Sequence, residues 1–447
     1  MREEKATIET HLTTIEGYSH AGEGVGKHEG KPVFIPFAAR GETVRFEITE
    51  EKKDFLRGKL TEILEPAPWR VSPPCPAYQN CGGCQLLHLD YEEELYFKQD
   101  RVTAALARIG GLKEINISPI LKMEEPWRYR HNARFHIRYT SEGVEIGYYQ
   151  LKSHIIEEIE DCLLLPTDFH HLRKAVADFL SKLRGNRHIP VNQVALRKGW
   201  ATGELLVQLL ADDFPRSVDR ESISALAVDF PNLKGLVITI DEIPEIPEMI
   251  LFGHSYYTEV ISEVRFRVPA RAFFQNNPIQ TEALLRTVSS FLEPQPHEIL
   301  FDLYCGVGLF AHALAPLVHM VFGIEENQEA VNAARINAEL NGNENTEFME
   351  GKVERILPSL ERKGIKPDAV ILDPPRSGST PQVLRELCRM SPQKIVYVSC
   401  DPATLARDLA IMVKEGYEVE KVQPIDMFPH TYHVECVALL VNTKTGR

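Results

Sequence analysis

The stretch Ile299-Leu300-Phe301-Asp302-Leu303-Tyr304-Cys305-Gly306-Val307-Gly308 decides the fold of the last third of the chain. Its apolar half predicts a buried strand, and its glycine-containing half follows as a loop that opens a helix. Further apolar runs alternate with helical segments in the same way, at Met320 to Ile324, Ala369 to Leu372, Ile395 to Val398 and Cys436 to Val441. This alternation predicts an α/β fold, with a doubly wound, Rossmann-like domain over residues 263–447.

A nucleoside cofactor is indicated at the carboxyl ends of these strands, where such sheets bind ligands. Gly306-Val307-Gly308 permits close backbone approach, and Glu325 ends the second strand at the place where an acid would hold a ribose. The three-glycine dinucleotide fingerprint is missing, because Leu309-Phe310-Ala311 follows Gly308. The pattern therefore favours S-adenosylmethionine, which has no pyrophosphate to cradle, over a nicotinamide cofactor.

The strand predicted at Ala369 to Leu372 is followed by Asp373-Pro374-Pro375-Arg376. Asp-Pro-Pro at this edge resembles the motif of methyltransferases that act on nucleobases. Enzymes that methylate amino groups follow the prolines with an aromatic side chain that stacks on the base. Because Arg376 stands there instead, we expect a target other than an exocyclic amine.

Cys400 lies at the end of the next strand, which stops at Ser399-Cys400 before Asp401-Pro402 opens a helix with a capping side chain. The helix dipole and its N–H groups would favour a thiolate there, which is the nucleophilic form of cysteine. The alternative is a small apolar residue that ends a core strand, since most unpaired cysteines are buried and inert.

A thiol, a methyl donor site and Glu435, in His433-Val434-Glu435, together indicate one reaction. Carbon 5 of uracil is a poor nucleophile until something adds at carbon 6. The Cys400 thiolate would add there, and carbon 5 would then take the methyl group. Glu435 would remove the carbon-5 proton so that the cysteine is expelled. The base would have to leave any stack to reach the pocket.

Length and charge bound the rest of the molecule. A chain of 447 residues is long enough for two or three domains, and its net charge of −14 argues against a polycation but not against a local basic groove. The charged start and the lack of a membrane-length apolar run predict a cytoplasmic protein without a signal peptide or a membrane partner. We infer no obligate protein partner.

Residues 1–65 alternate like a small β domain, with strands predicted at Thr7 to Leu12, Pro32 to Phe37, Glu42 to Ile48 and Arg57 to Leu64. Short strands with interspersed Lys and Arg suit an OB-like RNA-binding barrel, and a charged surface on an accessory domain is the alternative. Gly22 to Lys27 lacks the Gly-Lys-Ser/Thr ending of a phosphate loop, so we interpret it as a hairpin crossing. The proline-rich segment after residue 65 predicts a boundary with a central domain, residues 66–262.

Three cysteines, Cys75, Cys81 and Cys84, are spaced C-x5-C-x2-C in a turn-rich segment. This spacing lets three thiolates converge on one metal centre, for which Cys162 is the best fourth ligand. An iron–sulfur cluster and four-thiolate zinc are both compatible with the spacing, and unrelated cysteines are the remaining alternative.

The segment Trp127 to Tyr139 carries four arginines, two histidines and no acid in a chain that is acidic overall. If it is a strand, its even-numbered arginines share one face. Arginine among aromatic residues suits phosphate contact and base stacking, so we expect RNA contacts from Arg128, Arg130 and Arg134. A solvated strand face is the alternative.

Taken together, these motifs resemble the 23S rRNA (uracil-5-)-methyltransferases, within the wider family that includes the tRNA (uracil-5-)-methyltransferases. The resemblance also covers Phe274-Gln275-Asn276-Asn277 and spans nearly the whole chain. It implies a class I methyltransferase domain, a barrel of the TRAM type, and a helical segment at about 91–126 that packs on the catalytic domain.

The resemblance also implies roles for single residues. Cys400 would be the nucleophile and Glu435 the general base. S-adenosylmethionine contacts would come from Gln275, Tyr304, Glu325 and Asp373, and a [4Fe-4S] cluster would sit on Cys75, Cys81, Cys84 and Cys162.

Two other functions compete with methylation of 23S rRNA. One is methylation of the T-loop uridine of tRNA; a barrel and a cluster on one chain favour rRNA, because tRNA enzymes typically resemble only the later parts. The other is a non-enzymatic, cluster-bearing RNA-binding or redox-sensing protein. The presence of Cys400, Glu435 and Asp373 speaks against it, because a binding module has no use for a nucleophile and a base.

Overall fold

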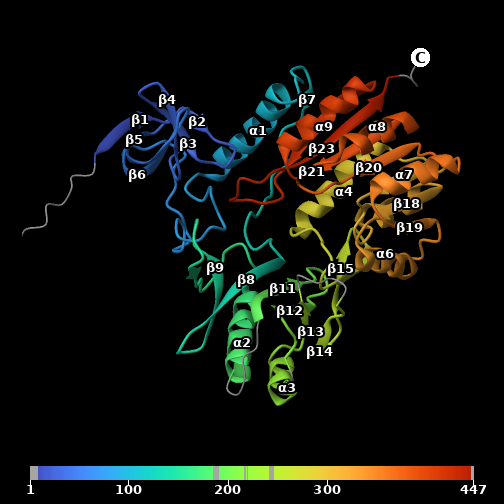
Figure 1. The fold of residues 1–447 in the computed structure, drawn as a ribbon, viewed down its shortest axis with the longest axis horizontal. Coiled ribbons are helices and arrows are strands. Elements are labelled where there is room, and N and C mark those ends of the chain that lie inside the picture. The colour runs from blue at the N-terminus through green and yellow to red at the C-terminus, as the bar shows by residue number, and fades with distance from the viewer. Residues whose placement is uncertain (1–8, 185–190, 216–217, 219, 241–245, 444–447) are drawn as a thin grey trace, which may run out of the picture. The chain divides into compact units, whose positions relative to one another are not determined.

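The computed structural model describes residues 9–184, 191–215, 218, 220–240 and 246–443 (Figure 1). The chain divides into two compact units. Unit 1 comprises Met1–Arg101, Tyr149–His154 and Phe428–His433, and unit 2 comprises Val102–Tyr148, Ile155–Met427 and Val434–Arg447. Within the described ranges, no helix is both long and apolar enough to cross a membrane.

Unit 1 contains a six-stranded sheet that forms a half-barrel, in the order β1-β5-β6-β4-β3-β2. The strands are β1 (Thr10–Thr14), β2 (Gly17–Tyr18), β3 (Gly24–His28), β4 (Lys31–Ile35), β5 (Thr43–Glu51) and β6 (Leu56–Glu65). The small β domain is confirmed, although the first two residues of the strand predicted at Thr7 to Leu12 lie outside the described residues. The glycine-rich run enters β3, where a Cβ at Gly26 would lie 2.5 Å from the Thr13 hydroxyl.

A second core of unit 1 forms around the start of α1 (Tyr91–Arg108). The segment Phe428–His433, which precedes Glu435 in the chain, is bound to this helix by three side chains. Lys98 Nζ donates to the Phe428 carbonyl at 2.9 Å, Arg101 donates to that of Tyr432 at 2.6 Å, and Glu94 pairs with His430 at 2.9 Å. The chain just before the predicted base is therefore fixed by α1.

The largest sheet of unit 2 has eight strands in the order β19-β18-β17-β20-β21-β23-β22-β7. They are β17 (Ile299–Leu303), β18 (Met320–Glu325), β19 (Thr346–Glu350), β20 (Ala369–Leu372), β21 (Lys394–Ser399), β22 (Tyr417–Ile425), β23 (Glu435–Asn442) and β7 (Asn116–Ile117). The first five of these run parallel, and β23 lies antiparallel between β21 and β22. The doubly wound prediction is confirmed. Strands β7, β19 and β22 were not among the predicted strands, and β7 lies in the segment of about 91–126 that was expected to be helical, because α1 ends at Arg108.

Helices and short connections join these strands. They are α4 (Pro278–Leu292), α5 (Leu309–Leu314), the 3-10 turn η1 (Ala315–Leu317), α6 (Gln328–Asn341), α7 (Val353–Arg362), α8 (Pro381–Met390) and α9 (Pro402–Lys414). Their buried side chains form one core with the sheet, to which Val102, Ala105 and Leu106 of α1 also belong. The two-residue strand β7 pairs in parallel with β22, so the far edge of this sheet comes from early in the chain.

A seven-stranded sheet, in the order β10-β9-β8-β11-β12-β13-β14, forms the other part of unit 2. Its strands are β8 (Asn132–Tyr139), β9 (Val144–Tyr149), β10 (Ile156–Glu157), β11 (Val191–Lys198), β12 (Leu205–Ala211), β13 (Leu233–Ile240) and β14 (Met249–Gly253), accompanied by α2 (Thr167–Arg184) and α3 (Arg220–Asp229). The hairpin of β15 (Tyr256–Ile261) and β16 (Val264–Pro269) leads from this sheet toward α4. The division into three domains at residues 65 and 262 stays a prediction.

Candidate active site

Cys400 and Glu435 are brought together by strand register. Strand β21 pairs with β23 up to Ser399 opposite Cys436, and the next position along the register sets Cys400 opposite Glu435. On the other side of β21, the parallel strand β20 ends one residue before Asp373. A thiol and two carboxyl groups therefore lie at one edge of the sheet, where the sequence predicted them.

Burial at this edge raises the pKa of every acid in the group. Burial raises the pKa of Cys400 to about 12, and the charge of Glu435 adds to the effect. The pKa of Glu435 is raised well above its ordinary value by burial and then by Asp373, whose own pKa burial raises to about 7. Arg376 is the cation that lowers the pKa of both Cys400 and Glu435. The site is a cluster of acids with raised pKa values beside one guanidinium.

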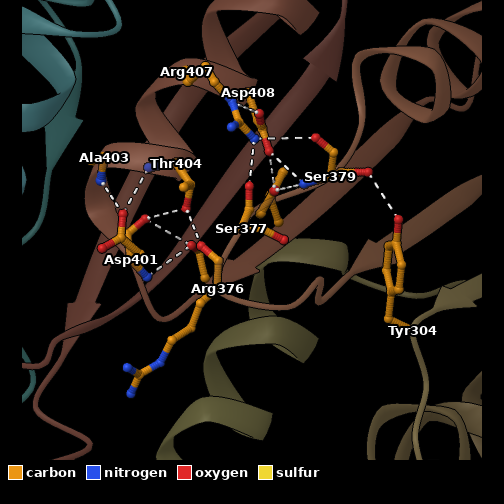
Figure 2. Close-up of polar contacts among 11 residues, drawn as sticks. Tyr304, Arg376, Ser377, Ser379, Asp401, Ala403, Thr404, Arg407 and Asp408 are labelled. Carbon is orange, nitrogen blue, oxygen red and sulfur yellow. Dashed lines mark hydrogen bonds and ion pairs between the residues drawn. The ribbon is translucent and has the colours of Figure 1, made fainter.

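The expectation that the α9 N-terminus favours a thiolate at Cys400 is therefore wrong. The Asp401 carboxylate caps this helix and accepts from the backbone N–H groups of Ala403 at 3.0 Å and Thr404 at 2.9 Å (Figure 2). Those donors are used by a carboxylate, whose charge also raises the pKa of Cys400. A thiol with a pKa of about 12 is protonated at neutral pH, so the site must ionise it during reaction.

The loop after the Asp-Pro-Pro-Arg motif is held by buried Asp408 of α9 (Figure 2). One carboxylate oxygen of Asp408 accepts from Tyr397 Oη at 2.6 Å and from the Ser379 N–H at 2.8 Å, and the other accepts from Arg407 Nε at 2.7 Å. A Cβ at Gly378, where φ is +75°, would lie 2.5 Å from Asp408. Sequence reasoning missed this network, although an acid at an apolar position of an otherwise buried helix face was a signal for it.

The same loop reaches toward the glycine loop after β17. Tyr304 Oη lies 3.2 Å from Ser379 Oγ (Figure 2), and Tyr304 itself adopts a left-handed φ of 63°. Thr404 Oγ1 donates to the Arg376 carbonyl at 3.3 Å. Thr404 and Asp408 of α9 thus fix the two ends of a loop that lies between a predicted cofactor contact and the thiol.

A cavity of about 760 Å³ opens beside the glycine loop, a size ordinary for small-molecule sites. Its lining includes Gly306, Glu325, Arg134, Arg271 and Phe273. The Glu325 carboxylate accepts from the Gly306 N–H at 3.1 Å and from the N–H of Asn327 at 2.8 Å, which fixes it at the end of β18. Of the other predicted cofactor contacts, Gln275 is buried and Asp373 belongs to the acid cluster.

The three arginines predicted to contact RNA do not share a strand face. Strand β8 begins only at Asn132, so Arg128, with a left-handed φ of 57°, and Arg130 precede it. The Arg128 guanidinium donates to Asp161 at 2.6 Å and to the Cys162 carbonyl at 3.0 Å, so it has a structural role in unit 2. Arg134 alone of the three is on β8, and it is exposed at the cavity.

The predicted metal ligands are half-exposed thiols. Cys75, Cys81 and Cys84 lie in one loop of unit 1, and Cys162 belongs to unit 2. Among the residues that the structure describes, no three cysteine, histidine or acidic side chains are placed so that they could hold a metal ion. The donor chemistry of the four thiols suits a thiolate-bound metal.

Known proteins resemble the chain in both of its halves. Residues 247–443 match the tRNA (Uracil-5-)-methyltransferase family, and residues 9–61 match the TRAM domain. An uncharacterized RNA methyltransferase of Clostridium acetobutylicum is 37% identical over 95% of each chain, and one of Halalkalibacterium halodurans is 35% identical over 96% of each.

Among solved structures, a tRNA (uracil-54, C5)-methyltransferase of Pyrococcus abyssi, bound to S-adenosyl-L-homocysteine, aligns with a TM-score of 0.75 and 26% identity. The alignment covers 96% of this chain and 100% of that one. The expectation that tRNA enzymes resemble only the later parts of this chain is wrong for that protein.

Proposed function

Because the chain belongs to the RNA (uracil-5-)-methyltransferase family, we propose that it methylates carbon 5 of a specific uridine in 23S rRNA. The observation that carries the proposal is the strand register that sets Cys400 opposite Glu435 at the carboxyl edge of the sheet. A nucleophile and a proton acceptor at neighbouring positions on adjacent strands suit a reaction at two adjacent carbons. One carbon forms a bond to the nucleophile, and the other loses a proton.

S-adenosylmethionine supplies an electrophilic methyl group when it is bound. In our proposal the chain's residues Gln275, Tyr304, Glu325 and Asp373 contact it. Cys400 Sγ adds to carbon 6 of the uracil, which makes carbon 5 nucleophilic. Since the pKa of Cys400 is about 12, its proton must first be transferred away. The charge of Arg376 favours that transfer because it lowers the pKa of the thiol.

Glu435 completes the reaction in this scheme. After carbon 5 has been methylated, its carboxylate takes the carbon-5 proton, the carbon 5–carbon 6 double bond re-forms, and the Cys400 sulfur leaves. A carboxyl whose pKa is raised by burial is a stronger base once it is ionised, which suits proton removal from carbon.

The proposal is tested by incubating the protein with S-adenosylmethionine carrying a labelled methyl group and either 23S rRNA or tRNA transcripts. We expect 5-methyluridine at one position in rRNA, its loss with Cys400→Ala, and its retention with Cys388→Ala, which removes a buried cysteine distant from this strand edge. Label in neither RNA would refute methylation, and label that persists with Cys400→Ala would refute the covalent mechanism.

Methylation of tRNA is the second candidate, and one observation favours it. The Pyrococcus abyssi tRNA enzyme aligns with nearly the whole of this chain. Label in tRNA alone would establish this alternative and leave the chemistry at Cys400 unchanged.

We also propose a [4Fe-4S] cluster on Cys75, Cys81, Cys84 and Cys162, with zinc as the rival metal. Support comes from the C-x5-C-x2-C spacing and from the partial exposure of all four thiols. We assign the cluster no chemical step. RNA contacts are proposed for the TRAM domain and, from the exposed arginine on β8, for Arg134.

A further inference from the structure

A short strap, residues 270–277, connects β16 to α4 and carries Gln275. The seven-stranded sheet binds the strap through its backbone carbonyl groups. His131 donates from its backbone N–H to the Asn276 carbonyl at 3.1 Å, and its ring Nε2 lies 2.6 Å from the Gln275 carbonyl oxygen. Arg197 Nη1 donates to the Ala272 carbonyl at 3.0 Å. Three carbonyl groups of the strap are therefore fixed from outside it.

His131 is completely buried between two acceptors. Its Nδ1 lies 3.1 Å from Glu259 Oε2, on the opposite side of the ring from the Gln275 carbonyl. A carbonyl oxygen can only accept, so the contact with Gln275 needs a proton on Nε2, while Nδ1 lies within ion-pair distance of the Glu259 carboxylate. The imidazole thus joins a buried carboxylate to the backbone of a single residue, Gln275.

Glu259 anchors this arrangement to the rest of unit 2. Its carboxylate, also completely buried, accepts from the N–H groups of Trp200 at 2.7 Å and Ala201 at 3.1 Å. Trp200 and Ala201 follow β11, the strand on which Arg197 stands. Burial lowers the pKa of Arg197, which shows that its surroundings disfavour the charge.

Three buried polar side chains are an expensive way to fill a core, because their desolvation opposes folding and apolar side chains of similar volume would pack without that cost. Apolar residues, however, could not fix the direction of the carbonyl groups in a segment without regular structure, because they offer no hydrogen-bond donors. The polar contacts of His131 and Arg197 can fix these directions. They are made with the carbonyl groups of Ala272, Gln275 and Asn276.

We propose that His131, Glu259 and Arg197 are positioning residues, which hold the strap so that Gln275 meets S-adenosylmethionine. The seven-stranded sheet would then help to build the cofactor site as well as to contact RNA. Arg134, on β8, lines the cavity, and His131 immediately precedes that strand, so one short segment would serve both tasks. The inference rests on the proposed function in one respect, namely that Gln275 contacts the cofactor.

The test is the affinity of the full chain for S-adenosyl-L-homocysteine, measured by titration calorimetry together with the melting temperature. We expect His131→Gln and Arg197→Met each to weaken binding by about tenfold, which is ordinary for the loss of a coupled contact. Arg197→Lys keeps the charge and a donor, so it should retain more affinity than Arg197→Met. Arg173→Met is the matched control, since Arg173 is a largely buried arginine that donates to the Ile159 carbonyl at 2.7 Å rather than to the strap.

The possible outcomes distinguish the positioning role of His131 and Arg197 from the cofactor contact of Gln275. If Gln275→Ala weakens binding but folded His131→Gln and Arg197→Met do not, the positioning role is refuted while the cofactor contact stands. If Gln275→Ala leaves the affinity unchanged, the assignment of Gln275 to the cofactor fails. If His131 and Arg197 only stabilise the fold, His131→Gln and Arg197→Met should lower the melting temperature as Arg173→Met does and leave the affinity unchanged. That result would also overturn the inference.

Discussion

The electrostatic control of Cys400 can be tested by replacing Glu435 with glutamine. The negative charge of Glu435 is one cause of the raised thiol pKa, so its removal should make Cys400 more acidic. The two residues occupy neighbouring positions across β21 and β23. The β-carbons of such a pair are about 5 Å apart, and a full charge at that distance contributes about 3 kcal/mol at an effective dielectric constant of about 20.

That value is an upper bound, because the full charge is present only when the Glu435 carboxyl is ionised, and burial raises the pKa of that group. Taking about half of it, the pKa of Cys400 should fall by about one, from about 12 toward 11. At pH 8 the thiolate fraction is about one in ten thousand in the wild-type protein, and it should rise about tenfold in Glu435→Gln.

The assay is the rate of Cys400 alkylation by iodoacetamide between about pH 7 and pH 10, followed by peptide mass spectrometry. Glu298→Gln is the matched control, because Glu298 is a buried carboxylate just before the amino end of β17. The rate should rise only in Glu435→Gln. An unchanged or slower rate in that variant would refute the electrostatic reasoning.

Glu435→Gln also tests whether Glu435 is the general base. Without a carboxylate at position 435, the methylated adduct cannot lose its carbon-5 proton, so the RNA should remain covalently attached to Cys400. Denaturing gel electrophoresis with labelled RNA detects the adduct. Continued release of methylated RNA would show that another group removes the proton.

Three further predictions concern parts of the chain away from this pair. Asp408→Asn should lower the free energy of unfolding by about 1–3 kcal/mol, because its buried donors lose a charged acceptor, and an unchanged urea midpoint would contradict this. Cys81→Ser should lower the iron content of protein purified without oxygen, whereas Cys388→Ser should not; equal iron in both would argue against the cluster. Arg134→Ala should weaken RNA binding and reduce its logarithmic salt dependence by about one, while Arg128→Ala should leave that slope unchanged, as salt titrations of filter binding can show.

The arrangement of the reactive groups was predictable because it follows from local rules. An apolar run that stops at Cys400, another at Asp373 and a third that begins after Glu435 all belong to one sheet, and parallel strands bring their carboxyl ends to one edge. The order of the strands and the direction in which each runs were enough to predict that these groups lie at the same edge.

The pKa values of those groups were not predictable in the same way. The pKa of Cys400 depends first on burial and then on carboxyl groups, of which Glu435 and Asp373 come from other parts of the chain and Asp401 is the next residue. Local sequence showed the helix N-terminus and its cap at Asp401, but neither the burial of the thiol nor the two distant carboxyl groups. Similarly, strand periodicity could not show that β8 begins at Asn132, because the left-handed residue Arg128 and its bond to Asp161 are set by tertiary contacts.

The pairing of β7 with β22 has a consequence for synthesis of the protein. Ribosomes add about 5–20 residues per second, so the roughly 300 residues between these strands take roughly 15–60 seconds to emerge. Throughout that time the nascent segment around Asn116 has no partner strand. An excised C-terminal half would keep the outer edge of β22 open permanently. We therefore expect a fragment that begins at residue 263 to self-associate, and the complete chain to need protection from such contacts while it is being made.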